Sequence, residues 1–232
     1  MKSEMQVVLH RWTLEPDFLA GEAACICTDF DNEEKALTTA LDSHHDSVME
    51  HCSFTFIVSG VSRVLLAQLT RHRIASFSVR SQRYVSYRDG FGYVIPPSIE
   101  ALGENKVAEY EAQMEQMHKW YCGWCDDLGD AHKEDARFVL PNACETKIML
   151  TMNARELHHF FSLRMCSRAQ WEIRRMADEM YRQARNVAPM LFAKADPGCW
   201  NSGCPEARPC KAPRKKFLFC KREKRRRDEG SI

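Results

Sequence analysis

The chain has little net charge, no long apolar run and no export signal. Its formal net charge is +1 over 232 residues, so it is nearly neutral. No apolar run approaches the roughly 20 residues that a membrane-spanning helix needs, and the N-terminus leads only into a short apolar patch at Val7–Leu9. These absences argue against a membrane anchor and a signal peptide, and they predict a soluble cytoplasmic protein.

Cysteine, in contrast, is abundant, with 11 residues, but its setting argues against disulfides. The count is odd, the chain is long and an export signal is absent, so we expect reduced thiols. Cys122 and Cys125 form a C-x-x-C pair, a motif that normally opens a helix, where the dipole lowers the thiol pKa. Because this pair lies inside a predicted helix, packing is favoured and redox chemistry is the alternative.

Composition divides the chain at about residue 195. Residues 1–195 carry the patterns of one globular domain, and 44% hydrophobic content is enough for a sizeable core. Residues 196–232 form a cysteine-rich basic tail. No aromatic residues interleave its Lys221–Arg227 run, so we expect a flexible tail rather than a nucleic-acid site. Zinc is the alternative for its cysteines, which match no paired C-x-x-C spacing: Cys199, Cys204, Cys210 and Cys220.

Apolar periodicity predicts a mixture of short strands and longer helices. Strands are expected at residues 5–9, 53–58 and 83–87. Helices are expected at residues 16–27, 32–41, from 62 to about 69, 107–128, 130–139, 154–164 and 169–191. Residues 144–153 fit either a strand or the start of a helix. In the last helix we expect Met176 and Met180 to face inward, and Glu172 and Arg175 to face outward.

The most unusual stretch is residues 71–84, which holds four arginines, a histidine, three serines and a glutamine. A guanidinium group is a planar fork of five donors that stays protonated, so several of them beside hydroxyl and amide groups suggest an anionic ligand such as a nucleotide phosphate. A solvated basic turn fits the arginine count equally well.

The predicted helix at residues 154–164 has an apolar stripe that ends in a charge. Leu157 and Phe160 belong to the stripe, and Arg164 closes it. A half-buried arginine needs an anionic partner, so Arg164 is either in a structural ion pair or faces a ligand.

Residues 43–51 contain three histidines, which could be metal ligands. A catalytic metal site also needs a cysteine or carboxylate at a defined spacing. We therefore favour a helix cap and ligand-facing loop, and we expect no metal.

Several blocks in the chain together resemble the flavin-dependent thymidylate synthase family. Arg71-His72-Arg73, then seven residues, then Ser81-Gln82-Arg83 has the form R-H-R-x7-S-x-R, which is similar to the family's signature motif. Other blocks follow in the family's order at residues 45–56, 137–141, 153–155, 163–164 and 169–173. The resemblance covers roughly residues 18–191, and several ordered blocks are more specific than any one of them.

The resemblance implies a fold, a reaction and an assembly. The fold is α+β, with a central antiparallel sheet flanked by helices on both sides. The reaction is reductive methylation of dUMP to dTMP, with 5,10-methylenetetrahydrofolate as methylene donor, FAD reduced by NADPH as hydride source, and no enzyme cysteine as nucleophile. The assembly is a homotetramer whose sites are shared between subunits, with no nucleic-acid or membrane partner.

The resemblance also implies roles for individual residues. Arg164 contacts the uracil edge, and because a guanidinium cannot readily accept a proton, its role is to stabilise negative charge. Residues expected to bind dUMP are Gln68, Arg71, Ser81, Gln82, Arg83, Arg137 and Arg164. Residues expected to bind FAD are Ser47, Arg71, His72, Arg73, Asn153, Arg155 and His159. His45 is expected near the flavin ring and the folate.

Two positions depart from the family pattern. Val79 stands where many relatives have an acidic residue, and His159 stands at a position that is often asparagine. We expect neither Cys144 nor Cys166 to act in catalysis. A competing hypothesis is a non-catalytic nucleotide- or RNA-binding protein that uses the same arginines, which predicts a colourless protein with strongly salt-dependent nucleic-acid binding.

Overall fold

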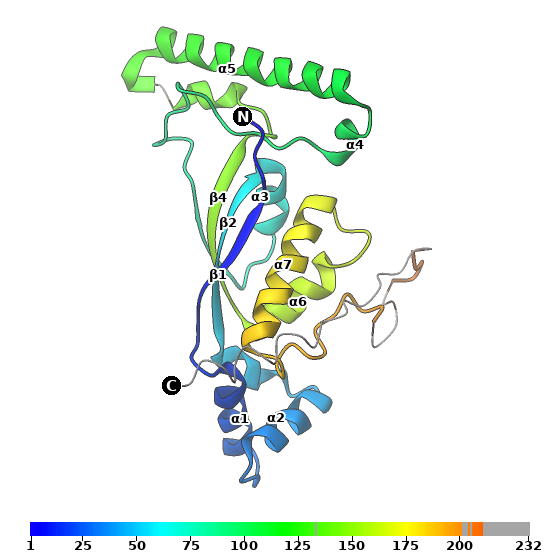
Figure 1. Ribbon diagram of the computed structural model, residues 1–232. Helices are drawn as coiled ribbons and strands as arrows, with labels where there is room; N and C mark the ends of the chain where they lie inside the picture. Colours follow the sequence, from blue (N-terminus) through cyan, green and yellow to red (C-terminus); the bar gives the residue numbers. More distant parts are fainter. Residues whose placement is uncertain (133, 201–203, 205, 211–232) are drawn as a thin grey trace, which may run out of the picture.

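A four-stranded antiparallel sheet runs through the middle of the molecule (Figure 1). The computed structural model describes residues 1–132, 134–200, 204 and 206–210. The strand order is β1-β2-β4-β3. The strands are β1 Gln6–Trp12, β2 Ser53–Ser62, β3 Ser76–Val79 and β4 Glu145–Asn153. Residues 144–153 are thus mostly strand, and the α+β class with a central antiparallel sheet is confirmed.

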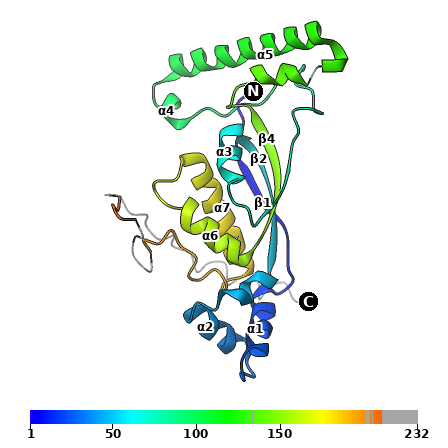
Figure 2. The same ribbon diagram turned by 180° about the vertical axis from the view of Figure 1, so that it is seen from behind.

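Helices surround this sheet on several sides. Helices α3, α6 and α7 pack beside it, α1 and α2 lie beyond one end, and α5 crosses the other end (Figures 1 and 2). The α-helices are α1 Pro16–Ile26, α2 Glu33–Asp42, α3 Arg63–Leu69, α4 Pro97–Glu100, α5 Glu104–His132, α6 Ala154–Arg164 and α7 Trp171–Val187. Two 3-10 helices, η1 and η2, span Asp46–His51 and Asp135–Val139. None of the helices in the described part of the chain has both the length and the apolar character needed to cross a bilayer.

Alternating residues of the two central strands form the floor of the main core. Phe54 and Phe56 of β2 are fully buried, as are Ile148 and Leu150 of β4. Phe56 lies opposite Leu150 in the antiparallel register. Side chains with alternating positions project from opposite faces of a strand, so these residues meet α6 and α7 on one face. Each large apolar side chain that is fully buried contributes about 1.5–3 kcal/mol of transfer free energy.

Three sequence predictions are wrong in detail. Residues 83–87 are not a strand: the Val85 amide donates to the Ser81 carbonyl at 3.2 Å, which forms a turn. The strand of this region is β3, because its Phe77 pairs with Leu150 at the sheet edge. The predicted helix at 130–139 is replaced by the end of α5, which is interrupted at Gly129 with a φ of 63°, and by η2.

The third correction concerns α7. Met176 and Met180 are buried as expected, but Glu172 is only 2% exposed. Its carboxylate accepts hydrogen bonds from the Ser62 amide at 2.7 Å and from the Ser62 hydroxyl at 2.5 Å. A carboxylate can be buried when its oxygens have such donors, so the helical pattern alone could not place this residue.

After α7 the chain folds back onto the core. Leu191 and Phe192 are fully buried, and the Asp17 carboxylate accepts the amides of Met190 and Leu191, both at 2.9 Å. The Phe192 ring packs edge-on against Phe54, with centroids 5.2 Å apart. Residues 188–196 therefore belong to the packed domain, while most of the predicted tail, including Cys220 and the Lys221–Arg227 run, lies outside the described residues.

Candidate active site

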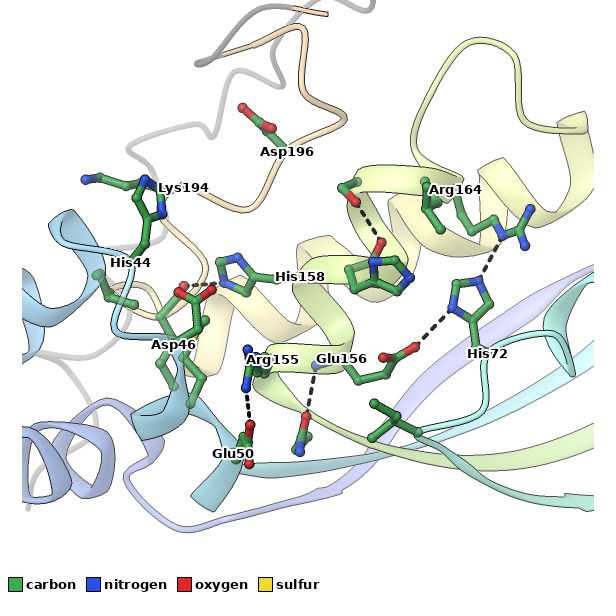
Figure 3. Close-up of a pocket in the computed structure, with 18 of the residues that line it drawn as sticks. His44, Asp46, Glu50, His72, Arg155, Glu156, His158, Arg164, Lys194 and Asp196 are labelled. Atoms are coloured by element: carbon green, nitrogen blue, oxygen red, sulfur yellow. Dashed lines mark hydrogen bonds and ion pairs between the residues drawn. The ribbon is translucent and has the colours of Figure 1, made fainter. Parts of the chain in front are cut away.

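A cavity of about 1030 Å³ lies beside α6 (Figure 3). Its walls come from four parts of the chain: residues 71–74 after α3, the length of α6, η1 with Leu41 and His44 before it, and residues 191–196. This volume is at the upper end of the range of about 300–1000 Å³ that is typical of ligand sites. The cavity is therefore large enough for a nucleotide-sized molecule.

The end of β4 leads into α6 without a loop and sets the position of the helix. Asn153 is the last residue of β4 and the N-cap of α6, where its side-chain oxygen accepts the Glu156 amide at 2.9 Å. Such a cap satisfies a backbone donor that the first turn leaves free. Glu156, Phe160 and Arg164 then follow at intervals of four residues along one side of α6.

Residues 71–73 alternate in direction after the end of α3. The His72 amide donates to the Leu69 carbonyl at 3.1 Å, and its ring is buried, whereas Arg71 and Arg73 are exposed. The buried ring lies edge-on to Phe160 with centroids 5.0 Å apart. The sequence Arg-His-Arg thus places one ring against α6 and two guanidinium groups at the cavity wall.

Three polar side chains form a continuous chain of hydrogen bonds in this wall. His72 Nδ1 lies 3.0 Å from Glu156 Oε1, and Arg164 Nε donates to His72 Nε2 at 3.0 Å (Figure 3). Arg164 Nη2 lies 3.4 Å from the Gln68 carbonyl oxygen. The pKa of His72 is lowered from its ordinary value, chiefly by burial and further by the positive charge of Arg164, while Glu156 opposes that change.

Charged side chains of both signs line the cavity, and the basic ones, four arginines and Lys194, stand beside four carboxylates: Asp46, Glu50, Glu156 and Asp196. Arg71, Arg73, Arg155 and Arg164 all line it. Arg155 forms an ion pair with Glu50 of η1, and burial lowers the pKa of Arg164 from its ordinary value. Guanidinium groups around a partly enclosed space favour an anionic ligand, because burial strengthens their attraction to it.

Most of the residues predicted around FAD lie together in this cavity. They are Arg71, His72, Arg73, Asn153, Arg155 and His159, and Arg164 joins them. Gln68 adjoins the cavity through its carbonyl oxygen, which faces Arg164. Ser47 and His45 are exposed residues in and before η1, and they flank rather than line the cavity; their neighbours His44 and Asp46 line it.

The remaining residues predicted to bind dUMP lie elsewhere in the single chain. Gln82 and Arg83 line a second cavity of about 470 Å³, bounded by α5. Arg83 forms an ion pair with Glu134 at 2.5 Å, and Ser81 hydroxyl accepts the Arg83 amide at 3.1 Å. The four-residue strand β3, roughly 13 Å long at about 3.3 Å per residue, separates these residues from residues 71–73.

Arg137 lies in η2, on the same side as this second group. Its guanidinium lies 5.9 Å from the Phe138 ring centroid. One chain therefore divides the predicted dUMP residues between two places: Arg71 and Arg164 with Gln68, and Ser81, Gln82 and Arg83 with Arg137.

Several polar residues of the large cavity were not predicted from the sequence. They are His44, Asp46, Glu50, Glu156, His158, Ser162, Lys194 and Asp196. Glu156 had a usable signal, because it lies two helical turns before Arg164 on the same side of a predicted helix. Lys194 and Asp196 had none, because they come from an irregular segment that only the fold brings back to the cavity.

Cysteine does not occur among the described residues that line the large cavity. Cys144, which is near Gln82, is fully buried, and burial raises its pKa to about 11. A thiol with a raised pKa is largely protonated and is a poor nucleophile. In the C-x-x-C pair of α5, burial likewise raises the pKa of Cys122.

Comparison with known proteins gives a consistent result over most of the chain. The family model described as thymidylate synthase complementing protein matches residues 8–190. A flavin-dependent thymidylate synthase of Geobacter sulfurreducens is 47% identical over 215 residues, which cover 87% of this chain and 91% of that protein. Proteins of the same description are 42% identical in Clostridium tetani, covering 87% and 91%, and 43% identical in Pyrococcus furiosus, covering 75% and 73%.

Proposed function

The chain belongs to the flavin-dependent thymidylate synthase family, and from this premise we propose that it is a methyltransferase that converts dUMP to dTMP. We propose 5,10-methylenetetrahydrofolate as methylene donor and FAD, reduced by NADPH, as the source of the hydride that completes the methyl group. The observation that carries the proposal is the cavity beside α6, where Arg71, Arg73 and Arg155 meet the half-buried Arg164.

The donors around the cavity fit a flavin dinucleotide. Its diphosphate carries two negative charges, and the exposed guanidinium groups of Arg71 and Arg73 can bind phosphate oxygens through paired hydrogen bonds. The Asn153 side-chain oxygen already accepts the Glu156 amide, and its NH2 group keeps two donors for a ligand. His159 is exposed at the same wall and can donate or accept one hydrogen bond.

Arg164 is the residue to which we assign the chemistry on the uracil ring. It is half-buried, and its Nε is engaged by His72, so its terminal NH2 groups are the ones directed at a ligand. A fixed cation next to a ring on which negative charge develops lowers the barrier without a proton transfer. Removing one such donor typically costs about 100- to 1000-fold in rate.

We propose that a second copy of the chain completes the dUMP site. Arg83 and Arg137 are separated from Arg164 within one chain by β3, although all three belong to the expected set. A homotetramer in which Ser81, Gln82, Arg83 and Arg137 of one subunit face the cavity of another would reunite them. Residues 1–195 would then be the catalytic domain.

The surroundings of the thiols support a mechanism without a cysteine nucleophile. The Cys144 thiol contacts a predicted dUMP residue, with its sulfur 3.7 Å from Gln82 Nε2. Burial raises its pKa to about 11, so the thiolate needed for attack on the uracil ring is scarce at neutral pH.

The test uses the full-length protein, its absorption spectrum and its release of tritium from dUMP labelled at C5. We expect a yellow protein that releases tritium and forms dTMP when NADPH and 5,10-methylenetetrahydrofolate are present. Bound FAD without tritium release would refute the proposed reaction. A colourless protein with steeply salt-dependent binding to RNA would instead support the non-catalytic alternative.

A further inference from the structure

We propose that Glu156 is a positioning residue, which acts through His72 to fix the orientation of the Arg164 guanidinium group. The proposal deepens the proposed function, since the purpose of that orientation rests on Arg164 facing the uracil ring. Its basis is a relay of two hydrogen bonds, each 3.0 Å long, that joins Glu156, His72 and Arg164. Glu156 itself is 6% exposed, and its Oε1 is engaged by His72.

The direction of each hydrogen bond follows from the chemistry of the groups. A guanidinium group only donates, so His72 Nε2 must accept the proton of Arg164 Nε and carries none itself. The ring proton of a neutral His72 is therefore on Nδ1, from which it donates to Glu156 Oε1. Glu156 thus selects the only neutral tautomer of His72 that can accept from Arg164.

Surrounding contacts hold His72 and Glu156 in place. His72 is 4% exposed and lies between Phe160, with ring centroids 5.0 Å apart, and His159, with centroids 5.8 Å apart. The position of Glu156 is set by the cap at Asn153, which accepts its amide. Glu156 and Arg164 both belong to α6, so the helix fixes their spacing, and the cap at Asn153 fixes its first turn.

The relay determines which face of Arg164 is available. A guanidinium group can bind an acceptor pair either through Nε and one Nη or through its two Nη atoms. His72 occupies Nε, and the Gln68 carbonyl lies 3.4 Å from Nη2. Only the terminal edge remains, which gives the cation one direction of approach to a ligand.

Protonation of His72 would break the relay. The ring would then carry a proton on Nε2, facing the Arg164 Nε–H, and two cations would be adjacent. The charged or titratable groups that face His72 are Glu156, Arg164 and His159. Glu156 is the group among them that favours the protonated ring, so its replacement by a neutral residue should lower the pH at which His72 becomes charged.

Two substitutions separate the hydrogen bond from the charge. Glu156→Gln keeps an oxygen that accepts from Nδ1, so the tautomer and kcat should stay within about threefold of wild type, with the acid limb of the pH profile moved to lower pH. Glu156→Ala removes the acceptor, and we expect kcat to fall about 10- to 100-fold with FAD still bound. Glu179→Gln and Glu179→Ala, at a partly exposed position of α7 that pairs with Arg182 and lies outside the cavity lining, are the matched controls and should match wild type.

The test measures turnover and, separately, the ring nitrogens of His72 by NMR of protein labelled with 15N-histidine. His72→Gln identifies the His72 signals. We expect the Nδ1–H tautomer in wild type and Glu156→Gln, and loss of that single tautomer in Glu156→Ala. An Nε2–H tautomer in wild type, or a wild-type kcat and pH profile in Glu156→Ala, would overturn the proposal.

The NMR measurement needs no turnover, so the two proposals can fail separately. A wild-type protein that forms no dTMP would refute the proposed function, while an Nδ1–H tautomer that depends on Glu156 would still support the relay. If Glu156→Ala does not fold, two other results test the relay. The Nδ1–H tautomer in wild type and an acid limb of Glu156→Gln at lower pH would support it, and the absence of either would refute it.

Discussion

The buried pair of Glu172 and Ser62 links α7 to the start of α3, and a substitution of Glu172 can test whether this contact stabilises the candidate site. Glu172 accepts the Ser62 amide and hydroxyl, and the Ser62 hydroxyl oxygen in turn accepts the Leu65 amide at 3.1 Å as the N-cap of α3. Because α3 leads directly to residues 71–73, α7 stabilises the segment that carries His72. Glu172→Ala should therefore weaken both the domain and this segment.

The magnitude follows from the groups that the substitution leaves without partners. A buried donor without a partner costs about 1–3 kcal/mol, and Glu172→Ala leaves the Ser62 amide in that state beside a small cavity that adds to the loss. We expect a loss of about 2–4 kcal/mol in the free energy of unfolding. That is a large share of the roughly 5–15 kcal/mol typical of a domain.

The pH dependence gives an independent check with a definite sign. Burial raises the pKa of Glu172 above its ordinary value, so the folded state binds this proton more tightly than the unfolded state does. The stability that this group contributes is present below its ordinary pKa and is lost as pH rises through the raised value. Relative to Glu172→Gln, which does not titrate, wild type should lose stability as the pH rises above the ordinary glutamate pKa and through the raised pKa of Glu172.

The assay is urea unfolding followed by circular dichroism, at fixed protein and FAD concentrations and at several pH values. Glu179→Ala, at a partly exposed carboxylate on the same helix that pairs with Arg182, serves as the control and should change the free energy of unfolding by less than about 0.5 kcal/mol. A Glu172→Ala variant as stable as this control, or a difference between wild type and Glu172→Gln that is the same at every pH, would rule out this role for Glu172.

Three further predictions concern the proposed reaction. Arg164→Ala should abolish turnover while FAD stays bound, because Arg71 and Arg73 remain; simultaneous loss of flavin, seen in the absorption spectrum, would assign Arg164 a structural role instead. Cys144→Ala should keep kcat within about threefold, since a thiol with a pKa of about 11 supplies little thiolate, and a loss of more than about 100-fold would contradict this. Arg83→Ala and Arg164→Ala should each be inactive, but subunits dissociated and reassembled together should regain part of the activity if sites are shared; no recovery in mixed tetramers confirmed by mass spectrometry would argue that one chain supplies both residues.

Local sequence signals were sufficient to predict an element where residues typical of helix or strand ends mark its boundaries. The helix expected at residues 154–164 is α6 over that same range, because a capping residue precedes an apolar stripe that ends at Arg164. The strand β3 was missed although Ser76-Phe77-Ser78-Val79 alternates, since four nearby arginines favoured a binding loop over a strand. The same arginines that suggested an anion-binding site thus hid the strand that lies between them.

The cavity residues that were predicted from the sequence are those that lie in or beside the blocks resembling the family. The Arg-His-Arg motif identified residues of the cavity wall, but the partner of His72 is Glu156, 84 positions away in the sequence, and no local spacing relates them. Likewise, the separation of Arg83 from Arg71 follows from the pairing of β3 with β4. Both facts depend on tertiary contacts, which a periodic pattern does not encode.

The direct junction of β4 and α6 has a consequence for which insertions and deletions the chain can tolerate. A change of one residue in β4 would either turn its buried face outward or move Asn153 away from the cap of α6. Arg155, Glu156 and Arg164 would then rotate together about the helix axis, by about 100° for each residue added or removed. Changes of length should therefore accumulate in exposed connections such as residues 101–103, while the length of residues 145–164 stays constant.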